Sequence, residues 1–224
     1  MSASLQENLP LIWTLEISLL SDTAPGRGEG VAGLVDSEID HDESGLPYLH
    51  GRRIKGLLSA QCAEILAALR LQGKDVKPWE QAADNIFGTT GLNKETIAHV
   101  SFGHGKFPSL VYADLALNSK EFPRLAVLDA LTTIRRQTKV DSTSGTAQDK
   151  SLRATRAIRR NLTFTSEIVF MGQSDQKMVG LLAACAASLR HIGMRRWRGM
   201  GWVKTRLFSA ACPNPLDLFE LEAR

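Results

Sequence analysis

The chain has 224 residues and a formal net charge of +3, with 27 Lys and Arg against 24 Asp and Glu. This length is large for one small domain and small for two, which predicts a single domain enlarged by insertions. The three cysteines are scattered without CxxC spacing, so we expect neither a disulfide framework nor a zinc site. The sequence contains no run of eighteen apolar residues and no signal-peptide pattern, which predicts a cytoplasmic protein with no membrane partner.

Hydrophobic spacing predicts the elements of the first half. Residues 11–20 alternate between apolar and polar side chains and predict a strand. Residues 21–35 are rich in glycine and predict a loop, whereas residues 52–71 carry apolar residues at helical spacing. A short helix is expected just before Gly88, and the alternation over residues 109–117 predicts a second strand.

The second half predicts two strands and one helix. Residues 162–171 and 201–210 are expected as strands, and the alanine-rich residues 176–191 as a helix. The resulting order, βαββαβ, is that of the ferredoxin-like or RRM-like α+β fold, with an antiparallel four-stranded sheet and both helices on one face. Two long insertions interrupt this palm. One is a helical and loop segment after the first helix, and the other is an arm between the second and third strands.

Positive charge is concentrated in two blocks. Residues 135–160 contain eight Lys or Arg against two Asp, and residues 190–206 contain six Lys or Arg and no acid. Such blocks on an otherwise balanced chain predict a surface for a polyanion. Residues 140–151, inside the first block, are small and polar, which predicts an exposed loop tip.

The most informative stretch spans residues 45–58 and reads GLPYLHGRRIKGLL. A glycine-punctuated loop leads here into the apolar helix through Arg52, Arg53 and Lys55. Backbone N–H groups, a helix N-terminus and three cations at one place suit the phosphates of a nucleic acid. This stretch therefore predicts a nucleic-acid site at the start of the helix.

An acidic segment lies immediately upstream. Carboxylates beside a phosphate-binding surface are unfavourable unless they bind a metal or take part in chemistry, so the two features together predict nucleic-acid cleavage as well as binding. His41, within the segment, is a candidate general acid or base near neutral pH. The acids are Asp36, Glu38, Asp40, Asp42 and Glu43.

Four patches in a fixed order resemble the RAMP superfamily, in particular the backbone subunits of type III CRISPR effector complexes, in a branch near subtype III-D. The resemblance covers residues 1–224 as a single RAMP domain, and residues 193–203 look like the family's C-terminal glycine-rich loop. The four patches are Val35-Asp-Ser after the glycine-rich loop; Gly45-Leu-Pro-Tyr with Gly51-Arg-Arg-Ile-Lys-Gly; Asn85-Ile-Phe-Gly with Leu110-Val-Tyr-Ala-Asp; and Val140-Asp-Ser-Thr-Ser-Gly-Thr-Ala leading through Ser151-Leu-Arg to Phe164 and Glu167.

The resemblance implies a subunit that binds guide RNA (crRNA), target RNA and other effector subunits in a filament. The palm would hold the guide at residues 51–55. The insertion at about 124–160 would be the thumb, which wedges between segments of guide–target duplex. Asp36 stands where catalytic members carry the aspartate that cuts target RNA, with Mg²⁺ or Mn²⁺ as cofactor.

The sequence also departs from the family pattern. His50-Gly-Arg-Arg replaces the usual Pro-Gly-Ser-Ser, and Arg156 stands in the region where an acid usually follows the thumb. Two alternatives therefore stay open, a non-catalytic RNA-binding scaffold and a guide-processing endoribonuclease that relies on histidine. His50 and His104, in glycine-bracketed loops, are expected to face RNA.

The candidate site consists of one catalytic residue and a set of cations. Asp36 is the candidate catalytic residue and metal ligand, with Glu38, Asp40 or Asp42 in reach as a second ligand if the loop curls. The candidate RNA contacts are Arg52, Arg53, Lys55, Arg135, Arg136, Arg153, Arg195, Arg196 and Arg198.

Overall fold

The computed structural model describes residues 9–26, 30–31, 34–89, 98–118, 120–138, 152–172, 174–193 and 199–223. At its centre is an antiparallel four-stranded sheet in the order β2-β5-β1-β6. With one helix after β1 and another after β5, the palm has the predicted βαββαβ order. The four strands are β1 (Ile12–Leu19), β2 (Val100–Phe102), β5 (Thr163–Phe170) and β6 (Val203–Phe208).

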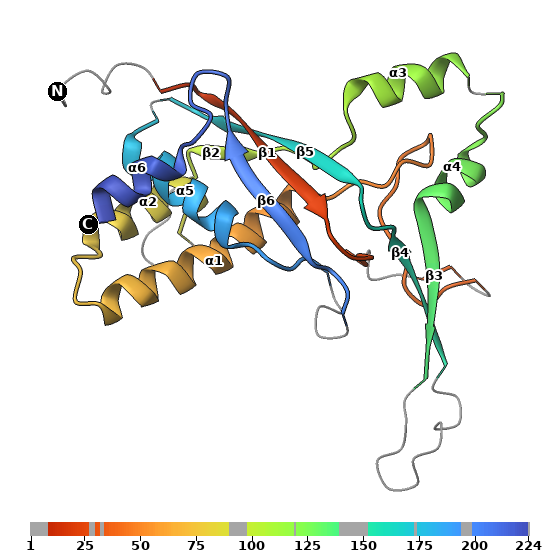
Figure 1. Ribbon diagram of the computed structural model, residues 1–224, viewed down its shortest axis with the longest axis horizontal. Helices are drawn as coiled ribbons and strands as arrows, with labels where there is room; N and C mark the ends of the chain where they lie inside the picture. The colour runs from red at the N-terminus through yellow and green to blue at the C-terminus, as the bar shows by residue number, and fades with distance from the viewer. Residues whose placement is uncertain are drawn as a thin grey trace, which may run out of the picture.

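Alternation along the strands places the core on one face of the sheet. In β1, Trp13 and Leu15 are fully buried, and Phe164 and Ile168 in the neighbouring β5 are buried beside them. The helices α1 (Gly51–Leu71) and α5 (Gln176–Ser188) pack together, and α5 also packs against β6. The helices α2 (Lys77–Phe87) and α6 (Leu216–Ala223) pack on α5, so all four gather at one side of the molecule (Figure 1). Within the described ranges, no helix is both long and apolar enough to span a membrane.

The prediction of a strand at residues 109–117 is wrong. This segment is the helix α3 (Ser109–Leu117), and the second palm strand is the three-residue β2 upstream of it. Leucine and alanine favour a helix here, and Pro108 stands at the N-cap, directly before the first helical residue. No α3 residue is fully buried, and the three that pack partly buried against the core, Val111, Tyr112 and Leu115, are spaced as on one face of a helix.

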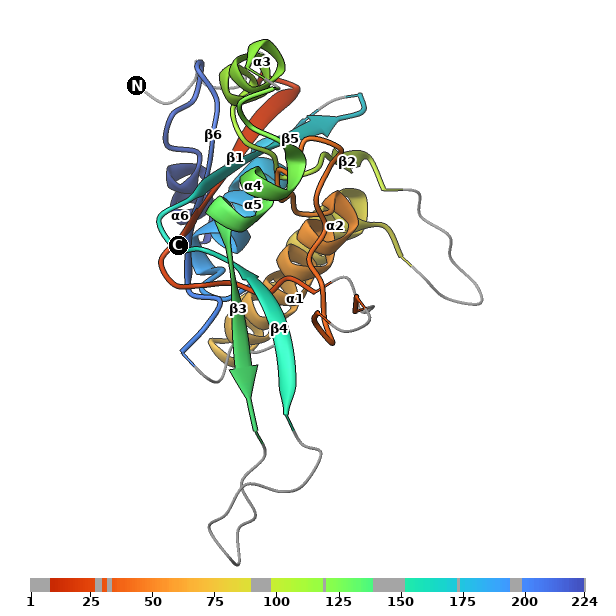
Figure 2. The same cartoon turned by 90° about the vertical axis from the view of Figure 1, so that its right-hand side faces the viewer.

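The insertion between β2 and β5 contains a hairpin that projects from the palm (Figures 1 and 2). After α3, the insertion continues with α4 (Arg124–Leu131), which leads into the hairpin strands β3 (Thr132–Gln137) and β4 (Arg153–Ile158). These two strands pair antiparallel, with Thr132 opposite Ile158 and Gln137 opposite Arg153. We call β3 and β4 the thumb hairpin. The predicted polar tip lies outside the described residues.

A buried ion-pair network joins the thumb hairpin to the acidic segment. Arg156 is 5% exposed, and its guanidinium lies 3.1 Å from Glu38 and donates to Asp129 and to the Thr132 hydroxyl, each at 3.0 Å. The Arg156 backbone N–H also donates to the Ser37 carbonyl at 3.0 Å. Glu38 is equally buried, so each charge depends on the other for compensation in the interior.

Replacing Arg156 with Met should lower the free energy of unfolding by about 3–5 kcal/mol, because Glu38 would stay buried without a counter-charge. The double variant Arg156→Met/Glu38→Met should recover most of this loss, since it removes both charges. Urea denaturation measures both effects. The exposed Arg136→Met in the same hairpin is the matched control and should change stability by less than about 0.5 kcal/mol. If Arg156→Met lowered the free energy of unfolding by no more than Arg136→Met does, this network would not be structurally important.

Candidate nucleic-acid interface

Helix α1 begins where the chain passes directly beside the loop that follows β2. A Cβ atom on Gly51 would lie 2.0 Å from the Phe102 carbonyl oxygen, so only glycine fits. The Gly51 N–H donates to Nδ1 of His104 at 3.1 Å. The first turn of α1 contains no acidic residue, so the partial positive charge of the helix N-terminus is not offset within the helix.

The three predicted cations at this helix start differ in their contacts. Arg53 donates through Nη2 to the Gly26 carbonyl at 2.5 Å, and its Nη1 lies 3.6 Å from the buried Asp40 carboxylate. Arg52 is exposed and makes no hydrogen bond or ion pair within the described part of the chain, and Lys55 is half-buried. Arg53 is therefore partly neutralised by Asp40, whereas Arg52 presents its charge to solvent.

Three rings cluster beside Gly51. Tyr48, His50 and His104 pack edge to face, with centroids 5.0–5.4 Å apart. Because Nδ1 of His104 accepts the Gly51 N–H, the proton of the neutral ring is assigned to Nε2, which makes this atom a donor. Partial burial, and then the nearby His50 and Lys106, lowers the pKa of His104 below its ordinary value. His104 is therefore a neutral hydrogen-bond donor at physiological pH.

Asp36 lies at the base of the thumb hairpin. Its backbone N–H donates to the Ala154 carbonyl at 2.8 Å, and its Oδ2 accepts the Ala154 N–H at 2.6 Å. Ser37 continues this contact in a parallel bridge with Thr155. The Asp36 residue is exposed, and its Oδ1 accepts no hydrogen bond among the described residues. One carboxylate oxygen is thus fixed by the hairpin, and the other is open to a ligand.

The neighbouring acids do not provide a second metal ligand. Glu38 pairs with Arg156, and Asp40 faces His50 and Arg53. Asp42 accepts the N–H groups of the turn that follows it. No group of three metal-ligating side chains is found among the described residues. The second ligand expected if the loop curls toward Asp36 is therefore not supplied by these three acids in the described part of the chain. Mg²⁺ is commonly held by one carboxylate together with substrate phosphates and water, and the open Asp36 oxygen suits that kind of site.

The thumb hairpin carries exposed cations on both of its faces. The pairing register places Arg135 and Arg153 on one face and Arg136 on the other, because cross-strand partners share a face and neighbours alternate. All three are exposed, and Arg135 forms an ion pair with Asp22. Cations on two faces suit an element inserted between two nucleic-acid segments.

A cavity of about 730 Å³ lies where the thumb hairpin meets the ends of β1 and β6, and arginine lines much of it. Arg159 and Arg160, which follow β4 directly, line it together with Arg135. Asp22 offsets part of this charge, and its Oδ1 also accepts the Arg160 N–H at 3.1 Å. Arg159 and Arg160 belong to the basic block of residues 135–160 but are not among the RNA contacts predicted from the sequence. In the sequence they follow the apolar Ala157 and Ile158 directly, and this abrupt change from apolar to basic residues could have indicated a cationic surface there.

The remaining predicted sites are placed as follows. Arg195, Arg196 and Arg198 lie outside the described residues. His41, the candidate general acid or base, has its Nδ1 3.2 Å from the Asp42 carbonyl and 3.5 Å from Arg124 at the start of α4.

The chain matches a known protein family, and its fold is shared by solved structures. The family model of the RAMP superfamily matches residues 16–204, and the chain belongs to that superfamily. A chain of a type III-B Cmr-beta complex, solved by cryo-EM bound to cognate target RNA, is similar with a TM-score of 0.65 at 11% identity, covering 93% of this chain and 99% of that one. A chain of Cmr-beta in the apo state is similar with a TM-score of 0.62 at 11% identity, covering 89% and 98%. No curated protein sequence matches the chain.

Proposed function

We propose that this protein is a subunit of a type III CRISPR ribonucleoprotein complex and binds guide RNA across the start of α1 and the base of the thumb hairpin. The observation that carries the proposal is the exposed Arg52 on an acid-free helix N-terminus, on the same RAMP palm as the arginine-lined cavity. The similar folds in Cmr-beta complexes, one of them bound to target RNA, support it. We further propose that other subunits of the complex adjoin this one in a filament.

The acidic segment connects the two parts of this surface. It runs from Asp36, beside β4, to Asp40, beside Arg53. Four residues of extended chain span at most about 14 Å, so the Cα atoms of Asp36 and Asp40 lie within about that distance. An RNA strand held at the start of α1 would therefore pass near the Asp36 carboxylate.

We also propose that Asp36 cleaves bound target RNA in the presence of Mg²⁺ or Mn²⁺. A divalent ion would supply positive charge that makes the 2′-OH a better nucleophile and neutralises the scissile phosphate. The open Oδ1 of Asp36 would hold it, and the bond from Ala154 to Oδ2 would fix the carboxylate. The thumb hairpin would orient the target segment beside this oxygen. A scaffold without activity is the alternative that the test below separates.

A histidine-dependent guide-processing activity receives less support. Nδ1 of His104 is occupied by the Gly51 N–H, so this ring has no free lone pair to act as a base. His41 contacts Asp42 and Arg124 instead of a second histidine.

The Arg52→Ala variant tests RNA binding. For single-stranded RNA, one phosphate contact contributes about 0.7 to the slope of log K against log salt concentration, so the slope should fall by about that amount with no loss of stability. Arg53→Ala should lower the slope as well, and it should also cost about 1–3 kcal/mol of stability because Asp40 loses its partner. Fluorescence anisotropy at a series of salt concentrations, with urea denaturation, measures both.

Arg70→Ala is the matched control, because Arg70 lies at the other end of α1 and pairs on the surface with Glu80. Its salt slope should equal that of the wild type. If Arg52→Ala behaves like Arg70→Ala, the start of α1 does not contact RNA phosphates.

Two substitutions of Asp36 test cleavage in the assembled complex. Asp36→Ala and Asp36→Asn should both lower Mg²⁺-dependent cleavage of matched target RNA by about 10²–10⁴-fold, with target affinity nearly unchanged. Asn retains an oxygen that accepts the Ala154 N–H, so it separates loss of charge from loss of this contact. Gel-based cleavage assays with and without a chelator measure the rates.

Glu43→Ala, which removes an exposed acid of the same segment, is the control and should cleave at the wild-type rate. Full activity in Asp36→Asn would assign Asp36 a structural role only. A wild-type complex that binds matched target without cutting it would leave the subunit as a scaffold.

A further inference from the structure

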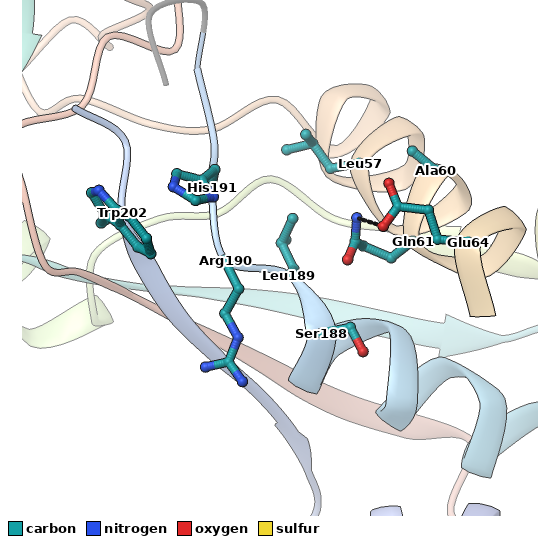
Figure 3. Close-up of a pocket in the computed structure, with 9 residues that line it drawn as sticks. All are labelled: Leu57, Ala60, Gln61, Glu64, Ser188, Leu189, Arg190, His191 and Trp202. Carbon is teal, nitrogen blue, oxygen red and sulfur yellow. Dashed lines mark hydrogen bonds between the residues drawn. The ribbon is translucent and has the colours of Figure 1, made fainter. Parts of the chain in front are cut away.

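A separate cavity of about 500 Å³ lies between α1 and the segment that leads from α5 to β6 (Figure 3). Leu57 from α1 and Leu189 from that segment give it an apolar lining, and Trp202 stands at its edge beside His191. This size falls in the range of small-ligand sites, and an apolar lining with a few polar groups is typical of them. Nothing in the RNA surface described above uses this cavity.

Trp202 differs from the tryptophans of the core. It is 46% exposed, whereas Trp13 and Trp79 are almost completely buried. Its ring centroid lies 4.0 Å from that of His191, and the two residues pair in an antiparallel bridge. A Cβ atom on Gly201 would lie 2.1 Å from the Ile192 carbonyl, so the backbones here pack closely. Trp202 thus presents an exposed aromatic ring from a closely packed backbone.

The cavity continues the helix face that begins at Arg53. Arg53, Leu57, Gln61 and Glu64 recur at spacings of four, four and three residues, which places them on one face of α1. Leu57 and Leu189 also line a smaller apolar cavity against Arg53. A strand bound at the start of α1 therefore has the cavity beside it along the same helix face.

The charges at the cavity favour a neutral planar group over a phosphate. Gln61 projects from α1 toward Leu189 and donates to the Glu64 carboxylate at 3.3 Å (Figure 3). An acid at this wall repels phosphate, whereas the side chain of Arg190, which points away from α1, supplies positive charge at the rim. The arrangement suits a nucleotide whose base enters while its phosphate stays outside.

We propose that this cavity receives one unstacked nucleobase of the RNA bound at the start of α1, with the base stacked on Trp202. This inference rests on the proposed RNA binding. Stacking on an aromatic side chain tolerates every base, because each base has a π face, and so suits a protein that binds guides of different sequence.

The test uses 12-nucleotide single-stranded RNAs in which one abasic site is moved along the strand. At one position the abasic site should weaken wild-type binding about tenfold. Trp202→Ala should weaken binding of the intact RNA by a similar factor and should bind the abasic and intact strands equally. Trp202→Phe should retain most of the difference, and Leu71→Ala, which removes an exposed apolar side chain at the far end of α1, should behave as wild type.

Two results would overturn this inference alone. One is an abasic penalty that is the same in wild type and Trp202→Ala, or absent from both. The other is unchanged RNA binding in Trp202→Ala with reduced self-association in sedimentation, which would make this face a protein contact. If the wild type binds no RNA, or if Arg52→Ala leaves its salt slope unchanged, the proposed function fails at its own site and the inference falls with it.

Discussion

The buried guanidinium of Arg156 holds together the parts of this protein that stand out from the palm. It lies within 3.1 Å of Glu38 from the acidic segment and reaches Asp129 of α4 and Thr132 at the start of β3. A charge at this depth is tolerated only with its partners, so the positions of the acidic segment and the thumb hairpin depend on each other. The same contact places residues 36–38 alongside β4 and so determines where the Asp36 carboxylate lies.

This arrangement separates the charges by role. Glu38 and Asp40 are used inside the molecule, where they compensate Arg156 and Arg53. Asp36 keeps one free oxygen at the surface, and Arg52 keeps a free charge at the start of α1. The acids and cations that alternate along the sequence are therefore divided between interior ion pairs and an exposed surface that carries Arg52 and the Asp36 carboxylate. Such a surface can attract RNA and still carry an acid for chemistry.

The sequence predicted the parts of the fold that depend on local patterns. The alternation in β1, the apolar spacing of α1 and the glycine at position 51 each reflect contacts that are visible in the structure. The prediction of a strand at 109–117 failed for two reasons. The real strand, β2, has three residues and is too short to show a periodic pattern. The leucines and alanines of α3 happen to alternate with other residues although the segment is a helix. The pairing of Glu38 with Arg156 joins residues 118 positions apart, and no local pattern reports it. The exposure of Trp202 likewise depends on how the backbone near Gly201 packs.

The proposed path of the RNA runs across the start of α1 and the base of the thumb hairpin. Ultraviolet crosslinking of the assembled ribonucleoprotein, followed by mass spectrometry of the RNA-linked peptides, tests it most directly. We expect crosslinks within residues 48–55, through Tyr48 and His50, and within residues 153–161, which comprise β4 and the turn after it. Crosslinks confined to α2 and α6, at the opposite side of the molecule, would contradict it (Figure 1).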